Sequence, residues 1–244
     1  MRNKLVISYF ISFFLTVQLA FSQARETTSK FQNADHPAFT DNYSFPSDIV
    51  TGAILQRLKQ DGISSRTKKG VISSEGVKYT RLSSEPIDLY FQIQGLGKRG
   101  RDGSVVTVFI SKGKDNFIGN ANDPSVVQNT LQYLNNFQHD ISLYSLQQQI
   151  KDQQKSIDSK SKQYNKLLKD SKKMQDKRYS LQRNLSAETN VSKQDKIRKK
   201  IRKLDKGILN KQTDIKNREG ELQQSKGQLS LLQKQLSQQM SQGK

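Results

Sequence analysis

The chain contains no cysteine and no tryptophan, and only two histidines among its 244 residues. The absence of cysteine excludes disulfide bonds, thiolate metal ligands and a thiol for lipid attachment. His36 and His139 lie far apart in the sequence and have no neighbouring ligand pattern that would suggest a metal site. We therefore expect neither a cofactor nor a bound metal.

Catalytic motifs are also scarce. Gly95, Gly97 and Gly100 spell G-x-G-x-x-G, but the residues that follow are typical of a strand, whereas dinucleotide binding needs a helix there. Lys98 and Arg99 within this stretch favour a basic hairpin loop, and no serine lies in a G-x-S-x-G turn. We predict that the protein is not an enzyme; a hydrolase site assembled from distant residues is the less favoured alternative.

Long hydrophobic runs are absent after the first twenty-two residues. Arg2 and Lys4 precede an uncharged run that ends before the small residues Ala20 and Ser22, a pattern typical of an export signal. The run has about fifteen residues, fewer than the ~20 that a membrane span needs. We predict that residues 1–22 are a cleaved signal peptide and that the mature protein is periplasmic or secreted; the alternative is an uncleaved anchor.

Acidic residues are few compared with basic ones, at 22 Asp and Glu against 41 Lys and Arg, which gives a net charge of +19. Residues 141–244 carry 25 of the basic and 10 of the acidic residues, so +15 of the charge lies there. Such a surface attracts anions, and salt screens the attraction. We predict contact with an anionic partner through the densest basic cluster, Lys196, Arg198, Lys199, Lys200, Arg202 and Lys203.

Ordinary solvated lysines on a helix are the alternative explanation of this cluster. Nucleic acid is a less favoured partner, because export would separate the chain from it and the cluster has no aromatic side chains for base stacking.

Residues 45–140 have the pattern of a compact domain, preceded at 23–44 by polar residues without periodicity that predict a flexible lead-in. A helix is expected to begin with Ser47 as N-cap and to end at Gly62. A last helix should begin with Asp123 as N-cap and Pro124 at its first position.

Three segments rich in β-branched and aromatic residues predict strands between these helices, at 77–82, 87–94 and 104–111, and a weaker strand is expected within 63–72. This order favours the α+β class, with a small antiparallel sheet and two helices on one face.

Heptad repeats fill residues 141–240 and predict long helices packed along a narrow apolar seam. The second repeat is two residues out of phase with the first, whereas heptad slips insert three or four, so we predict a turn near 187–192 and an antiparallel coiled-coil hairpin. Whether the helix preceding the repeat breaks near 138–142 or rotates its buried face is left open. The predicted seam residues are Leu146, Ile150, Ile157, Leu167, Met174, Leu181, Ile201, Ile208, Ile215, Leu222, Leu229 and Leu236.

The segments 88–93, 106–113 and 116–118, with Asp123-Pro124 after them, resemble uncharacterised exported proteins of Bacteroidetes. In those proteins a small α+β domain precedes a basic coiled-coil tail. The resemblance implies an envelope or periplasmic setting and transfers no site residues.

These patterns together favour an exported structural or interaction protein, in which an α+β head carries a basic arm that docks on an anionic envelope component or partner protein. The alternative is a small-ligand or peptide-binding head whose arm serves oligomerisation, so that a homo-oligomer is possible.

Overall fold

The computed structural model describes residues 23–113 and 116–242, so the predicted signal peptide lies outside the described residues. The chain divides into two compact units, Met1–Ser142 and Leu143–Lys244, called here the head and the helical unit. This division falls two residues from the boundary that the sequence predicts.

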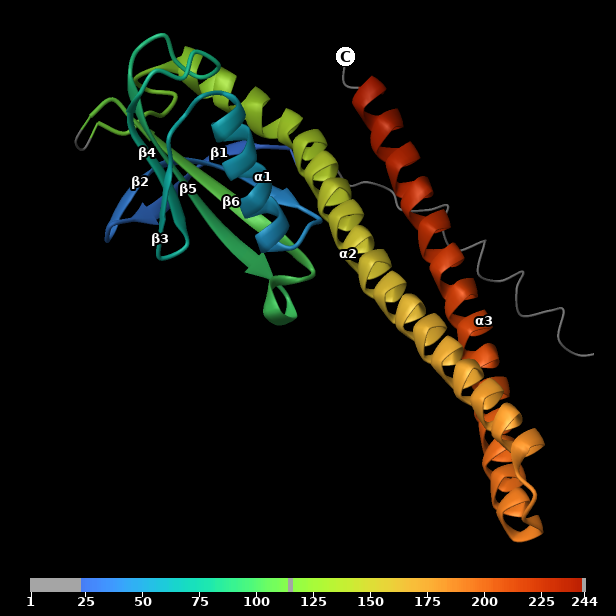
Figure 1. The fold of residues 1–244 in the computed structure, drawn as a ribbon. Coiled ribbons are helices and arrows are strands. Elements are labelled where there is room, and N and C mark those ends of the chain that lie inside the picture. Colours follow the sequence, from blue (N-terminus) through green and yellow to red (C-terminus); the bar gives the residue numbers. More distant parts are fainter. Residues whose placement is uncertain (1–22, 114–115, 243–244) are drawn as a thin grey trace, which may run out of the picture. The chain divides into compact units, whose positions relative to one another are not determined.

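The head contains a six-stranded antiparallel sheet with the strand order β1-β2-β6-β5-β4-β3 (Figure 1). The strands are β1 (Arg25–Phe31), β2 (Ala34–Tyr43), β3 (Arg66–Lys68), β4 (Val71–Val77), β5 (Ile87–Leu96) and β6 (Gly103–Ser111). The head is therefore α+β with an antiparallel sheet, as the sequence predicts.

The prediction of a flexible lead-in over 23–44 is wrong, because these residues form β1 and β2. The two strands join through Gln32 and Asn33, which both have positive φ (50° and 71°). Tight two-residue hairpin turns require this conformation, and asparagine tolerates it. The strand β1 is largely polar and exposed, so its sequence has little of the apolar alternation that marks a strand.

Two of the predicted strands, at 87–94 and 104–111, are confirmed as β5 and β6, whereas the one at 77–82 is wrong because β4 ends at Val77. Tyr79 and Leu82 are buried from a turn in which the Leu82 amide donates to the Tyr79 carbonyl at 2.9 Å. Their apolar character reflects burial rather than a strand. The weak strand within 63–72 is β3 with the start of β4.

One face of the sheet carries the main core. Phe39, Phe91 and Val108 are paired across the strands, lie on the same face and are buried. Helix α1 (Ser47–Gln60) contacts β5 and β6. Its N-cap position is Pro46, which has no capping side chain, so the prediction of Ser47 as N-cap is wrong by one residue.

The second head helix is the beginning of α2 (Pro124–Ala187). The hydroxyl of Tyr43, on the same sheet face as Phe39, donates to the Leu134 carbonyl of α2 at 3.0 Å. This bond places the start of α2 on the core face of the sheet. The helix is continuous through residues 138–142, and its buried positions change phase from Phe137 and Ile141 to Leu146 instead of the helix breaking.

The helical unit consists of the rest of α2 and of α3 (Val191–Gln242), which pack against each other (Figure 1). The Gln153 side chain donates to the Ser225 carbonyl at 2.8 Å, and Arg178 pairs with Asp205. A residue near the middle of α2 therefore contacts the second half of α3, and a residue late in α2 contacts the first half of α3.

The twelve predicted seam residues are all buried or half-buried in the structure. Along α3 the buried and half-buried positions from Gln194 to Gln239 recur at alternating intervals of three and four residues, with half-buried Gly207 as one additional position. This spacing is the one that the heptad repeat predicts for a helix with one covered stripe.

Candidate functional site

The predicted basic cluster lies in the first turns of α3, and all six of its residues are exposed. Arg198 is paired with Asp195 on the same helix at 3.3 Å, and both side chains are more than half exposed. Exposed pairs of this kind contribute little energy. The cluster therefore keeps most of its positive charge available to solvent and to a partner.

The connection between α2 and α3 fixes the start of this basic segment. The Asn190 side-chain oxygen accepts a hydrogen bond from the Lys193 amide at 3.1 Å, and the Gln194 side chain donates to the Glu188 carbonyl at 2.6 Å. Asn190 is thus the N-cap of α3. The turn lies within the predicted range 187–192.

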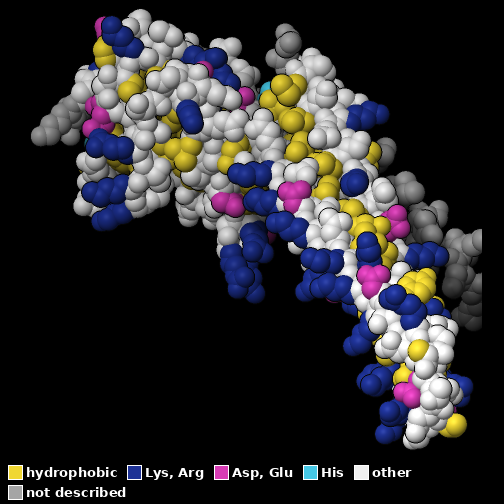
Figure 2. All heavy atoms as spheres, in the orientation of Figure 1, with side chains coloured by type: hydrophobic (Ala, Val, Ile, Leu, Met, Phe, Trp, Pro, Cys, Tyr) yellow, Lys and Arg dark blue, Asp and Glu magenta, His cyan; other side chains and the backbone are white. Residues whose placement is uncertain are grey.

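Basic residues of α2 add to the cluster near this turn. Residues 166–206 contain 15 Lys and Arg against 5 Asp and Glu. Figure 2 shows dark blue Lys and Arg side chains along the portion of the helical unit nearest the turn, whereas the far portion of α3 shows few.

A second candidate surface lies on the open face of the sheet, opposite the main core. Phe31, Ala38 and Phe109 form a smaller buried cluster there. The ring of Phe31 lies 4.8 Å from the ring of Tyr90 between centroids, although β2 and β6 separate their strands in the sheet. The sheet must therefore curve strongly, with this face on the concave side.

The curvature creates a groove of about 940 Å³ on the open face. The end of β1 lines it through Lys30 and Phe31, β3 through Arg66 and Lys68, and Tyr90 of β5 also contributes. Both edge strands of the sheet thus contribute to one cavity. Sequence reasoning missed this site because its residues come from distant segments, two of which had no strong strand signal.

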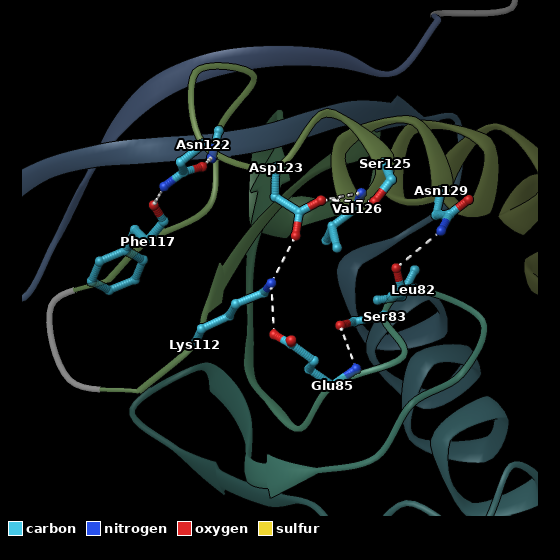
Figure 3. Close-up of polar contacts among 11 residues, drawn as sticks. Leu82, Ser83, Glu85, Lys112, Phe117, Asn122, Asp123, Ser125, Val126 and Asn129 are labelled. Carbon is cyan, nitrogen blue, oxygen red and sulfur yellow. Dashed lines mark hydrogen bonds and ion pairs between the residues drawn. The ribbon is translucent and has the colours of Figure 1, made fainter.

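A salt-bridge cluster connects the end of β6 with the start of α2 (Figure 3). The Lys112 ammonium contacts the carboxylates of Glu85 at 2.8 Å and Asp123 at 2.9 Å. Asp123 also caps α2 by accepting from the Val126 amide at 3.2 Å and the Ser125 hydroxyl at 2.7 Å. The predicted cap is confirmed.

These hydrogen bonds, first from Lys112 and then from Ser125 and the Val126 amide, lower the pKa of Asp123 to about 2. Hydrogen bonding to the two carboxylates raises the pKa of Lys112. Since Lys112 pairs with both carboxylates, the cluster holds β6 to the start of α2.

A third polar group connects α1 with α2 inside the head. Arg57 pairs with Asp61 at 3.0 Å and with Asp140 at 3.0 Å, and the Tyr79 hydroxyl donates to Asp61 at 2.7 Å. Burial raises the pKa of the Asp140 carboxyl, and the charge of Arg57 opposes that rise. A cavity of about 230 Å³ beside it is also lined by Arg81. The paired charges stabilise helix packing.

The remaining sequence motifs do not form sites. Gly97 and Gly100 belong to the β5–β6 hairpin loop, whereas Gly95 lies in β5 and pairs with Ser104, so the loop begins later than the sequence predicts. His36 stacks against Phe117 with ring centroids 3.9 Å apart. Among the residues that the structure describes, no three His, Asp or Glu side chains gather in a way that could hold a metal ion.

Comparison with known proteins finds no matching family model, no matching curated protein and no matching solved structure. Within the described part of the chain, no helix combines the length and apolar character needed to cross a bilayer.

Proposed function

We propose that this chain is an exported, non-enzymatic interaction protein, in which the α+β head carries a basic helical arm that docks on an anionic envelope component or an acidic partner. The arm is an antiparallel coiled-coil hairpin. The cluster at Lys196, Arg198, Lys199, Lys200, Arg202 and Lys203 makes the contact.

Burial and cross-helix contacts support the hairpin. The alternating three- and four-residue spacing of covered positions is that of a coiled-coil seam. Gln153 bonds to the Ser225 carbonyl, and Lys160 donates to the Ser225 hydroxyl at 2.6 Å. Glycine at position 207 leaves room for Met174, because a Cβ atom there would clash with the Met174 methyl group.

An excess of positive charge is the observation that supports the docking proposal. Residues 166–206 hold fifteen basic side chains against five acidic ones, and the six cluster residues are exposed. A surface of this kind binds anionic lipids or acidic polymers through many weak contacts that salt screens. The turn places these charges together at one end of both helices.

Replacing the six cluster residues with glutamine tests the proposal. The variant should lose binding to vesicles of anionic phosphatidylglycerol at low salt, because each Lys or Arg near such a surface contributes about 1 kcal/mol. Sedimentation with the vesicles measures the bound fraction, and neutral phosphatidylcholine vesicles set the background.

A matched control removes the same charge elsewhere by replacing Lys98, Arg99, Arg101, Lys216, Lys226 and Lys234, all exposed, with glutamine. This control should retain most of the binding. If both variants lose binding equally, net charge rather than the cluster decides it, and the proposed contact is wrong.

A second candidate function is a ligand- or peptide-binding head with an arm that oligomerises. The groove on the open face favours it, and so do three apolar side chains of the helical unit, Tyr179, Leu209 and Leu231, each 63% exposed. Such residues could pack against another copy. The association state of the chain distinguishes this candidate from the first.

A further inference from the structure

The strand β3 is an edge of the sheet with one neighbour, β4. Its three residues, Arg66, Thr67 and Lys68, are all exposed, and no strand of the described chain pairs with its outer side. The outward backbone groups of an edge strand are a template for one more strand. This edge borders the groove on the open face.

The register of the sheet shows which side chains of β3 face the groove. Arg66 pairs with Ser73, and Ser73 pairs with Tyr90 on β5. Residues directly opposite in an antiparallel sheet share a face, so Arg66 lies on the same face as Tyr90, as does Lys68 two residues later. A strand added to β3 would therefore place every second side chain opposite Arg66 or Lys68.

The charge of the groove determines which kind of strand can add to the β3 edge. Lys30, Arg66, Lys68 and Lys69 line it, and Glu75 is the one acidic residue among the lining residues. Glu75 pairs with Arg66 at 3.1 Å, but these side chains are 53% and 77% exposed, so the pair is weak and can exchange.

The same cations disfavour a basic strand as the occupant of this edge. Lysine and arginine on an edge strand disfavour pairing with another basic strand, including β3 of a second copy, because like charges would lie opposite each other. An acidic strand turns this repulsion into attraction. Phe31 and Tyr90 form an apolar floor that can accept a neighbouring apolar side chain.

We propose that the head binds an extended acidic peptide, which adds to the free edge of β3 with acidic side chains at alternate positions opposite Arg66 and Lys68. An apolar side chain of the peptide, two residues from an acidic one, contacts Phe31 and Tyr90. This site is separate from the basic cluster of α3 and does not depend on the arm.

The test uses the whole chain and a fluorescein-labelled peptide, Phe-Thr-Glu-Thr-Glu-Thr-Phe, with fluorescence anisotropy at about 0.15 M salt, where distant charges are screened. Two comparison peptides separate the contributions. One has adjacent glutamates (Phe-Thr-Thr-Glu-Glu-Thr-Phe), and the other has the first sequence with N-methylated backbone amides. We expect both to bind at least about fivefold more weakly, because the first breaks the cross-strand pairing and the second removes backbone donors.

The paired variant Arg66→Glu with Lys68→Glu should weaken binding of the acidic peptide about tenfold, since two attractive cross-strand pairs become repulsive. The same variant should bind Phe-Thr-Lys-Thr-Lys-Thr-Phe more tightly than the natural chain does. This gain shows that the variant is folded, so a loss of acidic-peptide binding cannot be attributed to unfolding.

The control Lys98→Glu with Arg99→Glu makes the same charge change on the β5–β6 loop and should leave peptide binding unchanged. The six-glutamine variant of α3 should also keep it, which separates this site from arm docking. The proposal is overturned if no peptide binds, if the adjacent-glutamate or N-methylated peptide binds equally well, or if either control loses as much affinity as the Arg66 and Lys68 variant.

Discussion

Asp123 shows how one side chain can serve two parts of the head. One carboxylate oxygen caps α2, and the other pairs with Lys112 at the end of β6 (Figure 3). The helix cap was readable from the sequence because it depends on neighbours two and three residues away. The pairing with Lys112 could not be predicted from the sequence, because only the fold brings β6 to the start of α2.

We expect Asp123→Ala to lower the free energy of unfolding by about 1 kcal/mol at pH 7, the usual cost of losing an N-cap. Asp123→Asn should cost less, because asparagine can still cap the helix. The pKa of Asp123 is about 2 in the folded chain, below its ordinary value of 3.8, so its carboxylate stabilises the fold above about pH 4.

This contribution is lost as the pH falls through the folded pKa. The stability difference between the natural chain and Asp123→Asn should therefore shrink progressively below pH 4, as measured by urea unfolding followed by circular dichroism. A difference that stays constant between pH 5 and pH 2.5 would show that the charge of Asp123 contributes nothing.

At the scale of elements, the two long helices are the most regular part of the chain. Their covered positions follow the heptad spacing, and polar seam residues are accommodated by specific bonds, such as Lys160 to the Ser225 hydroxyl. Long lysine and arginine stems can also cover apolar partners while the charge stays in water.

The absence of cysteine allows a direct test of the helix pairing. Met174→Cys with Ile208→Cys should form a disulfide within one chain, because Met174 packs beside Gly207. The control Leu168→Cys with Leu209→Cys places both thiols on exposed positions, 41% and 63% accessible, and should not cross-link within the chain. Non-reducing electrophoresis measures the products.

Exclusive cross-links between chains at Met174 and Ile208 would contradict an antiparallel hairpin and favour a parallel association of arms. If the control pair cross-links within the chain as much as the Met174 and Ile208 pair does, the cross-links result from helix flexibility and not from packing.

At the scale of the whole molecule, we expect a monomer of 27.9 kDa or, after removal of the predicted signal, slightly less. Ile157, Ile201, Ile208 and Leu222 are buried in the described helical unit without a second copy of the chain. Sedimentation equilibrium measures this mass independently of shape.

A stable dimer that dissociates on Leu209→Gln with Leu231→Gln would contradict this expectation. It would favour the second candidate, in which the arm serves oligomerisation. These two leucines are 63% exposed, so their replacement should not disturb the packing of α2 on α3.

The sequence by itself determined the features with a local period or a local partner. The heptad spacing identified both long helices and the turn near 187–192, the enrichment in β-branched and aromatic residues identified β5 and β6, and Asp123 indicated the start of α2. The basic cluster was also evident, because charge density along a helix needs no tertiary information.

Only the tertiary structure decided the features that depend on distant partners. The groove exists because curvature brings Lys30 and Phe31 near Arg66 and Tyr90. These contacts join segments separated by thirty or more residues, and no periodicity in the sequence encodes their meeting. Local patterns specify elements, whereas sheet order and curvature specify the surface on which a ligand can bind.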